Sequence, residues 1–233
     1  MLWLKAWLET RWKVASMVFM GVLLFGLTLE ALAAVRAHHP QQFLLVLLRV
    51  SVFLCFITGI TLAGSGIQTA SPRPGADRAN DGSTLFTLSL PVRRARLFAV
   101  RTVTGVLEMV VLLASFGFVI WLLVPTLVTS AQGALGYFAV IVSSSLAVYA
   151  ISACLSTFCD EGWRFRGSGL VVVVLFMLAT AGKLPRSVSL FPDIGATSPL
   201  VAQQIPWVTI ATACVLSILF FASALLIIQR RDY

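Results

Sequence analysis

Long apolar runs separated by short polar segments dominate the pattern along this chain. An α-helix rises about 1.5 Å per residue, so about 20 apolar residues cross the hydrocarbon core of a bilayer. The pattern therefore predicts an all-α, polytopic membrane protein, a single transmembrane domain over residues 1–233. Its six expected transmembrane helices are residues 14–35, 43–67, 99–124, 135–158, 168–184 and 207–228.

The first 13 residues, MLWLKAWLETRWK, differ from these runs because charges interrupt them. Leu4, Trp7 and Leu8 recur at helical spacing, while the charged residues fall on another face. Such a helix lies in the membrane interface, with tryptophan at headgroup depth. We expect a separate interfacial helix over 1–13. The alternative is a basic flank that continues the first span.

A second short element is expected between spans two and three, in a connection over residues 69–98. Its apolar part is too short to cross a bilayer. Ser83 or Thr84 can cap a helix, and Pro91 disfavours α geometry at Leu90. We therefore expect a short amphipathic helix that lies on the membrane surface and is kinked into the third span.

Composition supports a membrane protein over a soluble one. The chain has 59% hydrophobic and 11% charged residues, whereas a soluble domain is about half apolar and about a quarter charged. The first run also resembles a signal peptide, with Ala31-Leu32-Ala33 as a cleavage-like site. It is longer than a signal peptide's apolar region, and Glu30 precedes the site, so we expect it to be retained.

The net charge of +8 comes from residues at the ends of the apolar runs. No basic face is free of membrane flanks, so we expect no nucleic-acid partner. Cytoplasmic connections are enriched in Lys and Arg, so the basic residues predict that both termini are cytoplasmic. Of the 17, the following fall on the N-terminal side: Lys5, Arg11, Lys13, Arg73, Arg78, Arg93, Arg94, Arg96, Arg101, Arg164, Arg166, Arg230 and Arg231.

Motifs for chemistry are missing from the sequence. There is no HExxH and no GxxxxGK[ST], so the chain has no phosphate cradle for ATP. Gly64-Ser65-Gly66 is the nearest match to a serine-protease motif, but it lacks the first glycine, and the two histidines fall on the other side. The four cysteines form no CxxC pair. We expect no catalytic, cofactor or metal site, and therefore no enzyme.

Two charges fall inside the predicted third span. Glu108 follows Arg101 by seven residues, or two helical turns, so both lie on one face about 10 Å apart. Charges in a bilayer are costly and are functional candidates. We expect Glu108 to face a partner helix, a cavity or the Arg101 head through water. Structural pairing and a role in substrate passage both remain open.

The segment at residues 83–105, STLFTLSLPVRRARLFAVRTVTG, resembles the cytoplasmic turn of type-2 ABC transporter permeases. That family shows a similar run, ending in a Pro–Val–Arg pattern, between spans two and three. The chain end, QRRDY, is similar to the family's basic-basic-Asp ending. The resemblance assigns coupling to an ATPase to Ser83, Leu85, Phe86, Leu88, Leu90, Pro91, Val92, Arg93 and Arg94.

The resemblance implies a transmembrane permease subunit of an ABC exporter in a bacterial inner (cell) membrane. A separate ABC ATPase subunit would bind ATP and Mg, and a second permease chain, identical or related, would complete the path through the lipid bilayer. Two alternatives remain: a non-transporting membrane scaffold or assembly factor, and an ion-coupled secondary transporter. The latter class usually shows internal repeats and several intramembrane carboxylates.

The distribution of basic residues predicts the result of a topology assay. Reporter fusions at Ala131 and Ser189 should score as external, and a fusion at Tyr233 should score as cytoplasmic, as measured by paired reporters active on opposite sides of the membrane. An external score at Tyr233 would contradict the six-span assignment.

Overall fold

The computed structural model describes residues 2–31, 40–63, 94–123, 131–159, 161–181 and 205–230. These residues form six helices and no strand. The all-helical class predicted from the pattern is therefore confirmed for the part of the chain that is described. The helices are α1 (Leu2–Ala31), α3 (Pro40–Leu62), α5 (Arg94–Leu123), α6 (Ala131–Leu155), α7 (Glu161–Thr180) and α9 (Trp207–Arg230).

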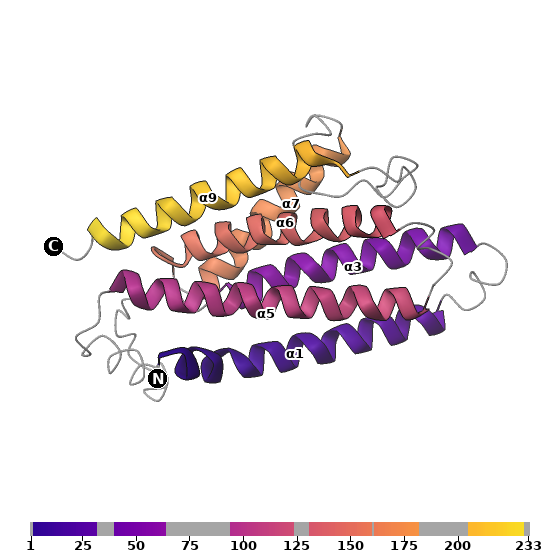
Figure 1. Ribbon diagram of the computed structural model, residues 1–233, viewed down its shortest axis with the longest axis horizontal. Coiled ribbons are helices and arrows are strands. Elements are labelled where there is room, and N and C mark those ends of the chain that lie inside the picture. Colours follow the sequence, from indigo (N-terminus) through magenta and orange to yellow (C-terminus); the bar gives the residue numbers. More distant parts are fainter. Residues whose placement is uncertain are drawn as a thin grey trace.

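The helices lie side by side along the long axis of the molecule, and successive helices alternate in direction (Figure 1). The start of α1 and the end of α9 consequently lie at the same end of the bundle. Helix α6 occupies the centre, in contact with α3, α5, α7 and α9, whereas α1 packs on α3 and α5. We call the end that holds the start of α1 the N-terminal end of the bundle.

Within the described residues, four helices are long and apolar enough to cross a membrane: α5, α6, α7 and α9. The candidate span of α6 is 72% buried, but that of α7 is only 11% buried. Large apolar side chains such as Phe19, Leu170 and Ile218 are exposed on the outside of the bundle. A surface this apolar is covered in a bilayer and not in water, so the chain is a membrane-embedded protein. Six membrane crossings stay a prediction.

Small residues let the central helices approach closely. A Cβ atom at Gly59 on α3 would lie 3.0 Å from the Ser145 carbonyl oxygen on α6. Between α6 and α9, Ala147 and Ala213 are fully buried and Ser217 is nearly so. Apolar burial gives helices little reason to associate within lipid, so close van der Waals contact between small residues holds them together.

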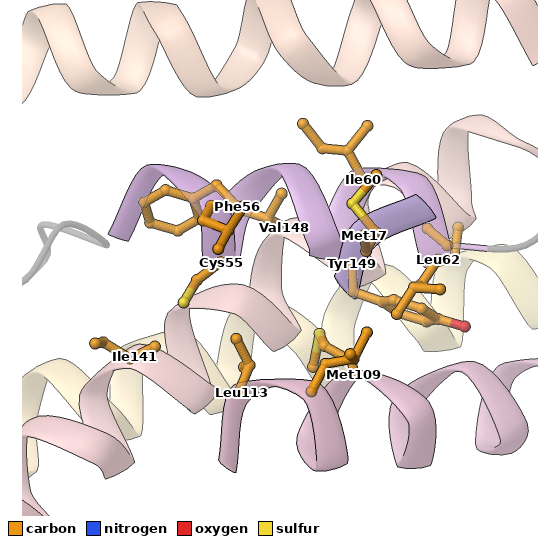
Figure 2. Close-up of a cluster of buried hydrophobic side chains, with 14 of the residues drawn as sticks. Met17, Cys55, Phe56, Ile60, Leu62, Met109, Leu113, Ile141, Val148 and Tyr149 are labelled. Carbon is orange, nitrogen blue, oxygen red and sulfur yellow. The ribbon is translucent and has the colours of Figure 1, made fainter. Parts of the chain in front are cut away.

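Larger side chains fill the space on the other side of α6. They come mainly from α1, α3, α5 and α6, with Ala224 and Ile228 of α9, and form one buried cluster (Figure 2). Cys55 and Cys154 are buried within it as free thiols, and Cys159 and Cys214 are also unbridged. The labelled members are Met17, Cys55, Phe56, Ile60, Leu62, Met109, Leu113, Ile141, Val148 and Tyr149.

The helix boundaries correct the sequence prediction at three places. Helix α1 is continuous from Leu2 to Ala31, so residues 2–13 are its first turns and not a separate interfacial helix. Helix α5 begins at Arg94, inside the predicted connection, and α7 begins at Glu161, seven residues before the predicted start at 168. Charged residues had limited the predicted spans, but backbone hydrogen bonds continue a helix past the apolar run.

Substitution of Gly59 tests the contact between α3 and α6. Gly59→Ala would press a methyl group against a backbone oxygen that cannot move independently of α6, at a cost of about 1–3 kcal/mol. The melting temperature of the detergent-solubilised protein should fall by several degrees. Gly26→Ala is the matched control, because no atom lies within 4 Å of a Cβ built there. Equal melting of both variants would contradict the close packing.

Candidate functional site

Polar side chains from several helices meet at one level of an otherwise apolar bundle. We call this set the polar layer and define it as Thr10 on α1, Glu108 on α5, Tyr149 on α6 and Arg164 on α7, together with Ala63 at the end of α3.

Glu108 is held by α1. The Thr10 hydroxyl donates a hydrogen bond of 2.5 Å to Oε1 of Glu108. The other carboxylate oxygen, Oε2, is buried and has no hydrogen-bond partner among the described residues. Of the three environments expected for Glu108, the structure provides the partner helix. Arg101 lies two turns closer to the start of α5 and is half-buried.

Tyr149 joins α6 to α5 at the centre of the layer. Only 1% of its surface is exposed, and its hydroxyl donates to the carbonyl oxygen of Thr102 over 3.3 Å. This approach requires a glycine at position 105, where a Cβ would lie 2.3 Å from the Tyr149 hydroxyl and 3.0 Å from the Leu62 carbonyl oxygen. Tyr149 is close enough to Glu108 and Arg164 to interact electrostatically with both.

Arg164 holds the end of α3. Its side chain is only 2% exposed, and Nη1 donates to the carbonyl oxygen of Ala63. The last carbonyl groups of a helix lack partners within the helix, and the partial negative charge there favours a cation. Ser152 of α6 also donates to the Ile60 carbonyl oxygen, over 3.4 Å. Two neighbouring helices thus hold the last turn of α3.

The sequence analysis missed the role of Arg164, which it treated only as a charge that sets topology. The sequence signal for this role is the periodic pattern of residues on the face of α7 that points into the bundle. Arg164 and Ser168 are four residues apart and both are buried, while Val172, a further four residues on, packs against the core. Extending the helical period backwards past the glycines would have placed Arg164 on that face.

On α1 and α7 the members of the layer lie toward the N-terminal end of the bundle, whereas Glu108 lies near the middle of the candidate span of α5, Ala95–Val119. The hydrogen bond between Thr10 and Glu108 aligns α1 with α5. Just beyond Thr10 come Arg11 and Lys13, followed by a charge-free stretch, and α5 likewise carries no charge after Glu108. On α7, the charges at 164 and 166 precede a charge-free stretch in the same way. Helices α1 and α7 therefore change from charged to apolar toward the N-terminal end of the bundle, as at a membrane interface.

The residues expected to couple to an ATPase lie almost entirely outside the described residues. These are Ser83, Leu85, Phe86, Leu88, Leu90, Pro91, Val92 and Arg93. Arg94 is the first residue of α5. The segment that contains them joins the end of α3, held by Arg164, to the start of α5 at the N-terminal end of the bundle.

No cluster of three or more His, Cys, Asp or Glu residues that could hold a metal occurs within the described helices. His38 and His39 lie outside them. The polar layer supplies one carboxylate, one phenol and one guanidinium, which suits helix positioning and charge compensation.

A scan against protein-family models gives no match, and searches of curated proteins and of solved structures give none either.

Replacement of Arg164 tests its hold on α3. Arg164→Met keeps much of the side-chain volume but leaves the Ala63 carbonyl without this donor, and hydrogen bonds to charged groups contribute about 1.5–3 kcal/mol. We expect a clear fall in the melting temperature of the solubilised protein. Arg96→Met on α5 is the control, because Arg96 is exposed and exposed substitutions usually change stability by less than about 0.5 kcal/mol. Equal stability of the two variants would exclude a structural role for Arg164.

Proposed function

We propose that this chain is the transmembrane permease subunit of an ABC exporter. It would form part of the substrate path and couple that path to a separate ATPase subunit. The proposal is supported by the sequence position of the motif at residues 83–105, which falls in the connection that follows α3 and in the first turns of α5. Both ends of the helical chain lie at the N-terminal end of the bundle.

The polar layer supports this proposal mechanically. A displacement of the segment between α3 and α5 would act first on the last turn of α3 and the first turns of α5. Arg164 and Ser152 tie the turn of α3 to α7 and α6, and Tyr149 ties α6 to α5 through Thr102. Packed helices transmit small shifts as rigid bodies. The whole N-terminal end of the bundle would therefore move with the segment.

Because the sequence has no P-loop motif to bind the phosphates of ATP, we assign ATP hydrolysis to a separate subunit. ATP and Mg would be bound by the partner ATPase, whose cycle would rock this bundle against a second permease chain. Burial of the apolar residues from Leu85 to Leu90 in a groove on that ATPase would fit the recognition of a short amphipathic helix by a soluble partner. The lipid interface is the competing cover for these residues.

A pull-down experiment tests this docking. The tagged chain is purified from native membranes, and a co-purifying P-loop ATPase is identified by mass spectrometry. Burial of one leucine contributes about 1.5–3 kcal/mol, so Leu85→Asp combined with Leu88→Asp should weaken ATPase binding by roughly a hundredfold or more. The pair Ala79→Asp and Asn80→Asp is the matched control, since it adds the same two charges to the polar part of the connection.

The result is read at equal membrane levels of each variant. Loss of the ATPase only in the leucine variant supports the docking element. Undiminished co-purification in that variant would show that the segment does not dock. If no P-loop ATPase accompanies the unmodified chain, the scaffold or secondary-carrier alternatives replace the exporter.

A further inference from the structure

Two arginines two residues apart on α7 have opposite environments. Arg164 is buried against α3, whereas Arg166 is exposed on the outside of the bundle. The Arg166 guanidinium lies over the ring of Trp163, 5.8 Å from its centroid, and that tryptophan is 63% exposed. The outer surface of α7 therefore begins with a cation stacked on an aromatic ring.

An apolar stripe continues from Arg166 along the same face. Leu170, Val173, Val174 and Met177 follow it at spacings of four, seven, eight and eleven residues, and all four are exposed. Residues at these spacings share one face of a helix. From Arg166 to Met177 the stripe is about 16 Å long.

A related arrangement occurs on α1, where the tryptophan directly follows the arginine instead of preceding it by three residues. Arg11 lies over the ring of Trp12, 5.7 Å from its centroid. Val18, Phe19 and Val22 follow Arg11 at seven, eight and eleven residues and are exposed. Arg11 adjoins Thr10 and Arg166 is near Arg164, so both arrangements begin close to the polar layer, where the charged parts of the helices end.

We propose that these two faces bind anionic phospholipids in the leaflet on the N-terminal side. The guanidinium groups would bind the lipid phosphate, for which their planar donor geometry is suited. The tryptophans would sit at headgroup depth, and an acyl chain would lie along each apolar stripe. Basic residues near an anionic leaflet attract it, and the attraction falls off within a Debye length.

A second copy of the chain fits these surfaces less well. Helix α3 contacts both α1 and α7 and lies between them, so the two stripes belong to separate sides of the bundle. A symmetric dimer uses one self-complementary patch on each subunit. Two separate surfaces with the same spacing of cation and apolar residues are better matched by a small ligand that occupies each of them. The lipid sites do not depend on the exporter proposal.

Native mass spectrometry tests the proposal on the whole chain in detergent with equimolar phosphatidylglycerol and phosphatidylcholine. The unmodified protein should retain phosphatidylglycerol in preference. Arg166→Gln and Arg11→Gln should each weaken binding at one site about fivefold, the factor that one basic residue contributes at an anionic surface. Arg166→Lys should bind phosphatidylglycerol more weakly than the unmodified protein but more tightly than Arg166→Gln. Lysine keeps the positive charge but lacks the planar donor groups of the guanidinium. Arg96→Gln is the control, since it removes an exposed charge from a different helix, α5.

Other outcomes overturn the proposal. Equal retention of the two lipids by the unmodified protein would show that the sites do not recognise charge, and an equal loss in Arg96→Gln would show that the attraction is diffuse. Competition by inorganic phosphate at matched concentration would indicate a free-anion site. Disulfide-linked dimers formed in native membranes by Met177→Cys, above the level of the unmodified chain, would show that a second copy covers α7. Melting in phosphatidylcholine alone confirms that each variant is folded.

Discussion

The structure depends on one constraint: polar groups inside a bilayer must find their partners within the protein. Several buried hydroxyl groups meet it locally, as when Thr58 and Thr104 donate to carbonyl oxygens one turn earlier in their own helices. Groups that cannot bond within their own helix join two helices. The bonds from Thr10 to Glu108 and from Arg164 to Ala63 are of this kind. The same requirement that makes the chain helical also ties the helices together.

Helix α6 forms the tightly packed centre of the bundle. Its candidate span is mostly buried although it contains several serines, because small side chains allow α3 and α9 to approach its backbone. The outer helices can then remain largely exposed to lipid. Their stability depends on α6, so a change in its packing would be felt by every helix that it contacts.

Position on a helix decides what a charge does in this protein. Arg164 and Arg166 have the same side chain and nearly the same depth, but the helical repeat turns one toward α3 and the other toward the outside. The first compensates a helix end and supports the proposed coupling, whereas the second is available to an anionic lipid. Because Arg164 is buried, its removal would strongly lower the stability of the protein. Because Arg166 is exposed, its side chain can change its partner without disturbing the packing.

The sequence by itself determined the helical class and the apolar stretch within each described helix, since apolar runs as long as a bilayer is thick leave no other stable form for the backbone. It also identified Glu108 as a charge in need of a partner. Only the tertiary structure decided that the partner is Thr10, that Arg164 donates to the Ala63 carbonyl oxygen and that Gly105 accommodates Tyr149. These facts depend on how the helices are aligned with one another, and contacts across separate helices leave no local period in the sequence.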